Sequence, residues 1–255
     1  MRAVIIGAGR GMRLEQHTTD VPKTMVEVVG RPMLAHIVDA LGAAGIRLQD
    51  IVFVGGYAQE VVKHAYPEFT FVNNENWEHN NIMLSLMCAR EYLQEGFLST
   101  YADIVYDAAI VQKLVASGHD ITLGCDTHWR RRYVNRTRHP ESDAEKMRAD
   151  GERVLELGRR IPSEQASGEF IGVMKLSAEG ARTLLEHFDE AEPKFEGREF
   201  REGRSWEKAY LIDLLQHMLE RDVLMRRVDT PGAYMEIDTV EDLSFAAEWW
   251  RSRPK

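Results

Sequence analysis

The sequence predicts one three-layer α/β domain built on a Rossmann-like sheet that is mixed but mostly parallel. Short apolar runs alternate with amphipathic segments along most of the 255 residues, a pattern typical of strand–helix–strand units. The hydrophobic content of 44% is enough for a substantial core. No repeat, low-complexity tract or linker rich in Pro, Gly and Ser divides the chain. We therefore expect a single domain over residues 1–255.

The expected elements follow from apolar runs and helical periodicity. Buried strands are predicted at residues 3–6, 51–54, 69–72, 104–106, 121–124, 170–176 and 223–228. Helices with one apolar face are predicted at residues 32–44, 81–93, 107–117, 178–188, 206–220 and from Val240. An arginine-rich segment at about 127–167 and a polar one at about 193–205 interrupt this alternation. They predict two insertions into the domain.

Charge and cysteine content exclude several classes of protein. Lys and Arg number 32 against 41 for Asp and Glu, a net charge of −9 that repels nucleic acid and anionic membranes. No apolar run is long enough for a membrane span and no signal peptide is recognisable, so we expect a cytoplasmic protein. Cys88 and Cys125 alone support neither a disulfide scaffold nor a cysteine zinc site. Both are expected to be buried.

A glycine-rich loop at residues 7–14 follows the first predicted strand directly. Glycines permit close backbone approach, so successive N–H groups can point at phosphate oxygens, although such a loop can also be an ordinary turn. A dinucleotide fingerprint fails because Met12 occupies its third glycine position, and the chain contains no Walker A motif. Arg10, Arg13 and Lys23 add cations near the loop. This combination suits a nucleoside triphosphate.

Three segments in this order resemble the N-terminal signature of the sugar-phosphate nucleotidyltransferase family: residues 7–14, 21–28 and 30–34. Later segments are similar to its phosphocholine and aminoalkylphosphonate cytidylyltransferase branch: residues 73–86, 102–107, 142–146, 167–172 and 236–243. Ala102 departs from the pattern, since many relatives have glycine there. The resemblance implies a nucleotidyltransferase-type fold with a small insertion over the active site.

The resemblance also implies roles for individual residues. Lys23 and Arg13 would be catalytic, with Lys23 stabilising charge that develops at the α-phosphate. The nucleotide would be bound by Ala8, Gly9, Gly11, Met12, Arg13, Lys23, Asn81 and Ser85. Asp103 and Asp238 would bind Mg²⁺, whose preference for carboxylate and phosphate oxygens suits this reaction. The alternative for both aspartates is ordinary capping of a turn or helix.

The acceptor site is expected around an aromatic and basic stretch at residues 126–138, which could equally be a solvated loop. Arginines there would bind the acceptor's phosphate or phosphonate, and aromatic faces or carboxylates would bind its ammonium group. The candidates are Trp129, Tyr133, Lys146, Glu169, Tyr210 and Glu236. Trp206 is a further aromatic candidate, although its i,i+4 spacing from Tyr210 on one predicted helix favours core packing.

These observations predict an enzyme that couples CTP to a small phosphorylated or phosphonylated amino compound with Mg²⁺ and releases pyrophosphate. One alternative acceptor is a sugar-1-phosphate or an inositol phosphate. A non-catalytic nucleotide-binding regulatory module is an alternative of another class, but it would not need Lys23, Asp103 and Asp238 together. Trp249 and Trp250 would cover the core or form a subunit contact, which leaves a homodimer open.

Overall fold

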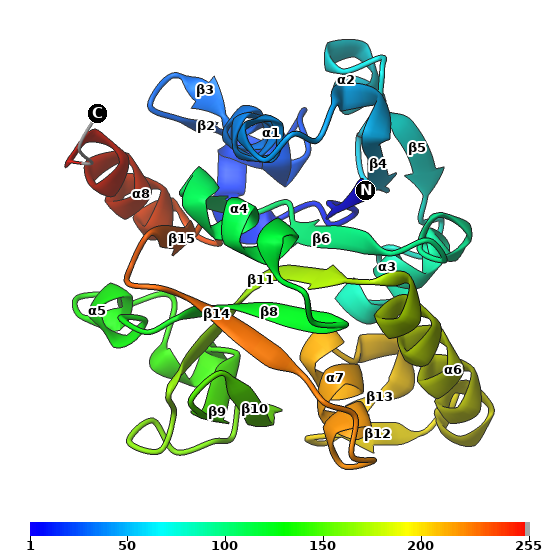
Figure 1. The fold of residues 1–255 in the computed structure, drawn as a ribbon. Coiled ribbons are helices and arrows are strands. Elements are labelled where there is room, and N and C mark those ends of the chain that lie inside the picture. Colours follow the sequence, from blue (N-terminus) through cyan, green and yellow to red (C-terminus); the bar gives the residue numbers. More distant parts are fainter. Residues whose placement is uncertain (253–255) are drawn as a thin grey trace.

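The computed structural model describes residues 1–252, within which the largest sheet has nine strands in the order β5-β4-β1-β6-β11-β8-β14-β10-β9 (Figure 1). The bounds of these strands are β1 Arg2–Ile6, β4 Ile51–Gly55, β5 Thr70–Asn73, β6 Phe97–Tyr101, β8 Ile121–Asp126, β9 Lys146–Asp150, β10 Arg153–Gly158, β11 Gly168–Leu176 and β14 Arg226–Thr230. Short ribbons pair β2 Glu27–Val28 with β3 Arg31–Pro32, β7 Ile104–Tyr106 with β15 Tyr234–Glu236, and β12 Glu199–Arg201 with β13 Arg204–Ser205. The predicted α/β class is confirmed.

The parallel direction of β1 and β6 places the loops that follow these two strands next to each other. Strands β5, β4, β1 and β6 are parallel neighbours, and β8 is parallel to β14. Strand β11 lies between β6 and β8 and is antiparallel to both. In the register of β1 and β6, Ile6 is opposite Tyr101. The loops that follow these two strands therefore leave the sheet side by side, as expected at the carboxyl ends of parallel strands.

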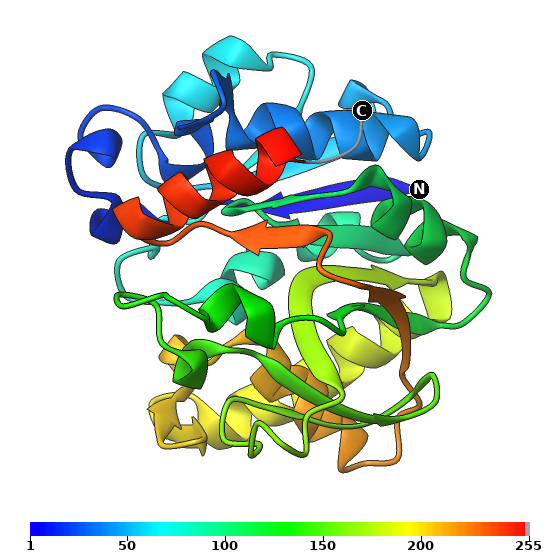
Figure 2. The same ribbon diagram turned by 90° about the vertical axis from the view of Figure 1, so that its left-hand side faces the viewer.

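Helices cover both faces of the sheet. Their bounds are α1 Met33–Ala43, α2 Gln59–Ala65, α3 Ile82–Cys88, α4 Ala108–Ala116, α5 Arg130–Tyr133, α6 Ala178–Phe195, α7 Leu211–Leu219 and α8 Val240–Ser252. Helices α1 and α4 pack together on one face, and α7 contacts both α3 and α6 on the other. Figure 2 shows α8, in red, lying along β15 beside the blue N-terminal segment. Within residues 1–252, none of the helices combines the length and apolarity that a bilayer span requires.

Burial explains why the chain forms these layers. All residues of β4, β6, β8 and β11 are buried, as expected for strands covered by helices on both faces. A second, smaller core cluster includes Leu14, Met33 and Ile237, with Trp249 and Trp250 packed against it. The two C-terminal tryptophans therefore cover part of the core, one of the two roles expected for them.

Trp206 is the largest fully buried side chain and is expected to be important for stability. It is 1% exposed, and its ring lies 5.2 Å from that of Phe188 and 4.8 Å from that of Phe200, measured between centroids. Trp206→Ala should lower the free energy of unfolding by about 3–5 kcal/mol, because it leaves a large cavity. Urea denaturation measures this loss. Trp249→Ala, at a partly buried position, should cost less, and a loss of under about 1 kcal/mol for Trp206→Ala would contradict the packing described here.

Two strand regions of the main sheet were not predicted. Strand β6 lies at the centre of the sheet, but Ser99 and Thr100 interrupt its apolar run although both are fully buried. Strands β9 and β10 form a hairpin inside the charged segment 127–167 and extend the edge of the main sheet. Their exposed charged residues, such as the ion-paired Arg148 and Glu156, hide the strand pattern. The predicted first insertion is therefore partly a continuation of the sheet.

Several predicted boundaries are wrong. The helix expected at residues 206–220 is divided: a 3₁₀ turn covers Trp206–Lys208, and α7 begins only at Leu211. Helix α6 extends seven residues further than expected, to Phe195, because Ala191 and Phe195 continue its packed face despite Pro193. Helix α3 ends at Cys88, and β14 is shifted to Arg226–Thr230.

Of the two cysteines expected to be buried, one is buried and one is exposed. Cys125 is buried in β8, whereas Cys88 is exposed at the end of α3. Because α3 stops there, Cys88 does not continue the buried face formed by Met83 and Met87.

Candidate active site

The glycine-rich loop leaves β1 beside the segment that carries Asp103. The N–H of Ala102 donates to the carbonyl of Ile6 at 3.1 Å. A Cβ on Gly7 would lie 2.8 Å from the Ala102 Cβ and 2.8 Å from the Phe53 ring, so glycine is required for this approach. Ala102 itself does not have positive φ, so alanine causes no backbone strain at this position.

Gly11 allows Lys23 to lie against the same loop. Its φ is +74°, and a Cβ there would lie 2.7 Å from the Lys23 Cδ. The Lys23 side chain is 11% exposed, and its Nζ donates to Asp103 Oδ2 at 2.8 Å and also to Asp238 Oδ1. Arg13 donates to the second oxygen of Asp238 at 2.7 Å. One buried ammonium group thus links two carboxylates from distant parts of the chain.

The electrostatics of this cluster keep its central groups charged. Burial alone would lower the pKa of Lys23, but Asp103 and Asp238 outweigh burial and raise it. Burial alone would raise the pKa of Asp238, but Lys23 and Arg13 hold it well below its usual range. Glu236 differs, because burial and then the charges of Asp238 and Asp103 raise its pKa well above the ordinary value. The charges of Lys23 and Arg13 therefore favour the ionised form of Asp238, whereas burial and the neighbouring carboxylates favour the protonated form of Glu236.

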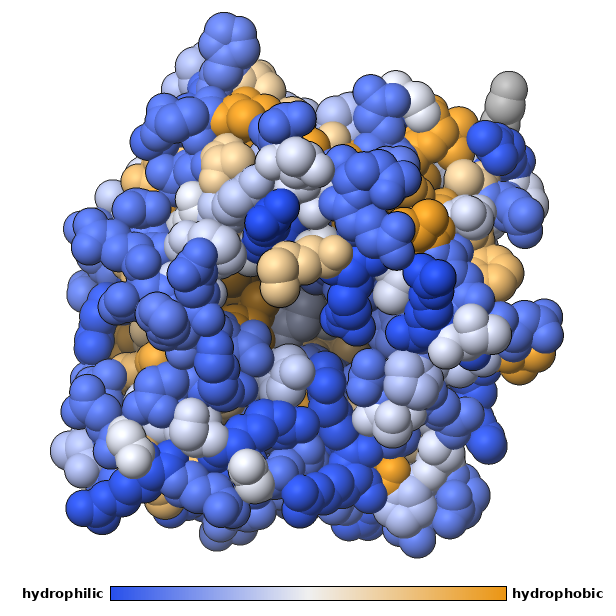
Figure 3. All heavy atoms as spheres, turned by 180° about the vertical axis from the view of Figure 1, so that it is seen from behind, coloured by the Kyte–Doolittle hydropathy of each residue, from blue (hydrophilic) through white to orange (hydrophobic). Residues whose placement is uncertain are grey.

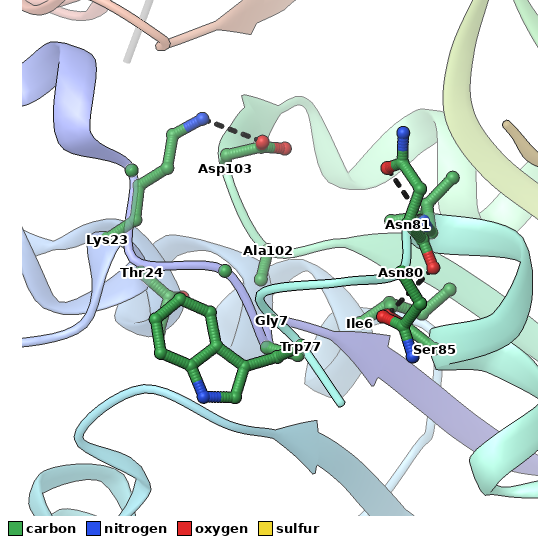
Figure 4. Close-up of a pocket in the computed structure, with 14 residues that line it drawn as sticks. Ile6, Gly7, Lys23, Thr24, Trp77, Asn80, Asn81, Ser85, Ala102 and Asp103 are labelled. Atoms are coloured by element: carbon green, nitrogen blue, oxygen red, sulfur yellow. Dashed lines mark hydrogen bonds and ion pairs between the residues drawn. The ribbon is translucent and has the colours of Figure 1, made fainter. Parts of the chain in front are cut away.

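A cavity of about 200 Å³ lies beside the glycine-rich loop. Figure 4 shows Lys23 and Trp77 on one side of it and Asn81 and Ser85 on the other. Six of the eight residues predicted to bind the nucleotide line this cavity: Ala8, Gly9, Gly11, Lys23, Asn81 and Ser85. The structure thus brings together residues from the first 25 positions and from the start of α3.

An amide network shapes the far wall of this cavity. Asn74 Nδ2 donates to Ser85 Oγ and to Asn80 Oδ1, both at 2.9 Å, and Asn80 Nδ2 donates back to Asn74 Oδ1. Asn81 Oδ1 accepts from the N–H of Ile82 and so caps α3. Ser85 also donates to the Asn81 carbonyl. These bonds fix the orientation of the polar groups before any ligand binds.

A second cavity of about 430 Å³ adjoins the first, and both include Asn81, Ile82 and Asp103 in their walls. Its other lining residues are mostly charged or aromatic: Arg13, Tyr101, His139, Asp143, Glu145, Arg159, Tyr210, Glu236 and Asp238. Strand β1 ends toward the face drawn in Figure 3, where a central hollow is bordered mainly by hydrophilic residues. The Lys23, Asp103 and Asp238 cluster therefore lies where the two cavities meet.

Arg159 and Glu145 form the charged wall of the second cavity. The sequence assigned neither of them a site role, although Glu145 lies in the recognised segment 142–146. The Arg159 guanidinium carbon lies 3.9 Å from the centroid of the Tyr210 ring, and one of its nitrogens lies 3.9 Å from Glu145 Oε1. Arg204 lies over the same ring at 4.5 Å. Tyr101 donates to Glu145 at 3.2 Å, and burial raises the pKa of Glu145 to about 7. Arg159 stands after β10, a strand that the sequence did not reveal.

A buried network around Asp242 holds the loop that carries Asp238. Asp242 Oδ2 accepts from the N–H groups of Asp238 and Thr239 at 3.0 and 2.9 Å and lies 3.2 Å from His139 Nδ1. Arg136 Nε lies 3.1 Å from the other oxygen of Asp242. Arg136, considered for phosphate binding, is thus buried in a structural network. The Thr-x-x-Asp spacing of Thr239 and Asp242 is a capping signal that could have identified this anchor.

The family model for the MobA-like NTP transferase domain matches residues 3–159, more than half of the chain. The chain belongs to this family. It is a nucleotidyltransferase, and the resemblance inferred from its motifs is confirmed.

Comparisons with individual proteins agree with this membership. CTP:phosphoglutamine cytidylyltransferase of Campylobacter jejuni is 27% identical over 97% of this chain and 100% of its own length. The 2-aminoethylphosphonate cytidylyltransferase of Lancefieldella rimae is 32% identical over 37% of this chain and 39% of its own. The solved structure of CTP:phosphocholine cytidylyltransferase from Streptococcus pneumoniae matches 98% of both chains with a TM-score of 0.71 and 19% identity. The nucleotidyltransferase-type fold is therefore confirmed.

The structure of this NTP transferase places several predicted acceptor residues away from both cavities. Trp129 and Tyr133 are buried in a separate small cluster with Ala144. Glu169 is 2% exposed, accepts from the Tyr133 hydroxyl at 2.6 Å and pairs with Arg132. Trp129, Tyr133 and Glu169, all expected to bind the acceptor, are therefore buried in the interior and line neither cavity.

Other predicted residues also lie elsewhere in this NTP transferase. Lys146 is buried and donates to the carbonyl of Arg159, so it does not line the acceptor cavity. Trp206 is in the core and shares no helix with Tyr210, because Tyr210 is the N-terminal cap of α7. Met12 is 74% exposed and lines neither cavity, and Arg13 lines the second cavity instead of the first. Tyr210 and Glu236 line the second cavity.

Proposed function

We propose that this chain is a cytidylyltransferase that couples CTP to a small phosphorylated or phosphonylated amino compound and releases pyrophosphate. The observation that carries this proposal is the position of Lys23 between two adjoining cavities, where it bonds both Asp103 and Asp238. The smaller cavity, beside the glycine-rich loop, would hold the nucleotide. The larger cavity would hold the acceptor. The full-length similarity to CTP:phosphoglutamine cytidylyltransferase supports this assignment.

The reaction asks an acceptor oxygen to attack the α-phosphate in line while pyrophosphate leaves. Two anionic reactants must meet, so catalysis depends mainly on positioning and on neutralising charge. Lys23 supplies a buried positive charge at the junction of the cavities, and Arg13 supplies a second on the acceptor side. Asn81 lies in the walls of both cavities and would help to align the two substrates.

Asp103 and Asp238 fit a divalent cation such as Mg²⁺. Asp103 Oδ1 is buried and, among residues 1–252, has no hydrogen-bond partner, although its other oxygen bonds Lys23. An unsatisfied buried carboxylate oxygen is costly, and a hard cation would satisfy it. The two aspartates would hold the ion, which would supply positive charge shared between carboxylates and substrate phosphates. Capping does not explain them, since both carboxylates bond Lys23.

The two alternatives fit the site less well. A sugar or inositol phosphate would call for neutral groups that bind hydroxyls, whereas the second cavity is lined mainly by charged side chains. A regulatory module would bind a nucleotide without chemistry. It would not need a buried lysine bonded to two carboxylates between two cavities.

The choice of nucleotide base tests the proposed function. Pyrophosphate release should be fastest with CTP when CTP, UTP, ATP and dTTP are each tested against phosphorylated amino compounds and sugar phosphates. The base would be bound by main-chain groups of the glycine-rich loop and by the polar wall at residues 80–85, held in place by the Asn74 network. Reactions without acceptor are the control. A clear preference for another nucleotide, or for a sugar phosphate, would contradict the proposal.

A further inference from the structure

The charges of the second cavity are unbalanced once the proposed metal pair is set aside. Asp143, Glu145 and Glu236 remain as acidic groups, and two arginines face them: Arg159 lies 3.9 Å from Glu145, and Arg13 lies 4.0 Å from Asp143. Arg13 is drawn toward Asp238 and lies on the side where the phosphate of the acceptor would enter. The wall farther from Lys23 therefore presents a carboxylate and a guanidinium group together.

The cavity has no free aromatic face for a quaternary ammonium group. The Tyr210 ring already has the guanidinium groups of Arg159 and Arg204 within 3.9 and 4.5 Å of its centroid. The Tyr101 ring packs against Gly172, where a Cβ would lie 2.3 Å away, and edge-on against Phe170. A trimethylammonium group has no N–H donors and depends on such faces. A primary ammonium group can instead donate to the Glu145 carboxylate.

Arg159 is held in place but its hydrogen-bonding capacity is not used. Stacking on Tyr210 fixes the plane of its guanidinium group, and the Nε is buried without a hydrogen-bond partner among residues 1–252. Its distance of 3.9 Å from Glu145 is too long for a hydrogen bond. A planar guanidinium with free N–H groups is suited to bind a carboxylate through two parallel hydrogen bonds.

We infer that the acceptor ends in an amino acid head group, whose carboxylate is bound by Arg159 and whose primary ammonium is bound by Glu145. This inference rests on the proposed function and narrows its acceptor to phosphorylated or phosphonylated amino acids. Opposite charges on one cavity wall are complementary to a zwitterion. Neither a simple aminoalkyl phosphate nor phosphocholine would use both groups.

The test compares acceptors that differ only by the carboxylate. O-phosphoserine is matched with phosphoethanolamine, O-phosphohomoserine with 3-aminopropyl phosphate, and phosphocholine is added as the quaternary analogue. With CTP, we expect kcat/KM to be at least about tenfold higher for the amino acid in one or both pairs, since a charged hydrogen-bonded pair is typically worth that much. Phosphocholine should be the poorest acceptor.

Variants of Arg159 and Glu145 test which side chain causes the preference for the amino acid acceptor. Arg159→Gln should lower kcat/KM for the preferred amino acid about 10–100-fold and change that of its decarboxylated partner by less than about threefold. Arg159→Lys should keep part of the preference, because it keeps the charge but loses the planar fork. Glu145→Gln should weaken both members of a pair alike, because both carry the ammonium group. Arg148→Gln, at an exposed ion pair on β9, is the matched control and should behave as wild type.

The outcomes separate this inference from the proposed function. Equal or better use of the decarboxylated acceptors in both pairs overturns the inference and leaves cytidylyl transfer standing. An equal loss for both members in Arg159→Gln also overturns it, because it would show that Arg159 only maintains the cavity. Failure to transfer from CTP to any of the five acceptors, together with transfer to a sugar phosphate, overturns the proposed acceptor class and the inference with it.

Discussion

Replacing Asp103 or Asp238 by asparagine is expected to lower nucleotidyl transfer by orders of magnitude while the fold is kept. Asparagine has nearly the same shape and can still accept from Lys23, but it lacks the charge that a divalent cation needs. Steady-state kinetics at saturating Mg²⁺ would measure the loss, and circular dichroism would check the fold. The metal dependence of each variant should also weaken, because one anionic ligand is missing.

Asp107→Asn provides the matched control for these two variants. Asp107 is the N-terminal cap of α4, and its side chain accepts from the N–H of Ala109 at 3.0 Å. Asparagine is nearly as good a cap as aspartate, so this variant should turn over at close to the normal rate. If Asp103→Asn and Asp238→Asn were as active as Asp107→Asn, neither carboxylate could be a metal ligand.

Lys23→Ala is expected to lower kcat by about 10²–10³ while CTP binding weakens much less, taking the loss of an oxyanion-hole donor as the scale. Only interactions that strengthen in the transition state accelerate chemistry, and charge grows at the α-phosphate as the acceptor attacks. Removing the ammonium also leaves Asp103 and Asp238 without their shared partner. Lys63→Ala, at a partly exposed position on α2 that lines neither cavity, is the control and should be neutral.

Lys23→Arg should not restore full activity. The Lys23 stem lies against Gly11, and its compact ammonium reaches two carboxylates in a space that a planar guanidinium does not match. A kcat within a few fold of wild type for Lys23→Ala would show a purely structural lysine. An increase in KM with unchanged kcat would show a contact made equally in ground and transition states.

The nucleotide half of the site was largely readable from the sequence because its parts are close together in the chain. The glycine-rich loop and Lys23 lie within the first 23 residues, and the glycine at position 11 is required by the nearby Lys23 side chain. The start of α3 supplies Asn81 and Ser85 through another short motif. Of the eight residues that these motifs predicted to bind the nucleotide, six therefore line the first cavity.

The acceptor half depended on long-range packing that no local pattern encodes. Trp129 and Tyr133 lie among arginines in the sequence in the manner of a ligand site, yet the two rings pack together in the interior and the Tyr133 hydroxyl bonds Glu169. Arg159 reaches the cavity only because an unpredicted hairpin, β9 and β10, joins the sheet. The i,i+4 spacing of Trp206 and Tyr210 suggested that both lie on one helix. Burial of the Trp206 indole in the core divides that segment, and Tyr210 lies on the wall of the second cavity.

The sequence by itself determined the α/β class, the family and the identity of the lysine and two aspartates at its centre. Apolar periodicity and short motifs are local properties of the chain, so they can be recognised without knowledge of the fold. Only the tertiary structure decided that Lys23 bonds Asp103 and Asp238, which lie 80 and 215 residues away along the chain. It also decided which charged side chains face the second cavity, because burying a charge requires a partner and that partner is found only after the chain has folded.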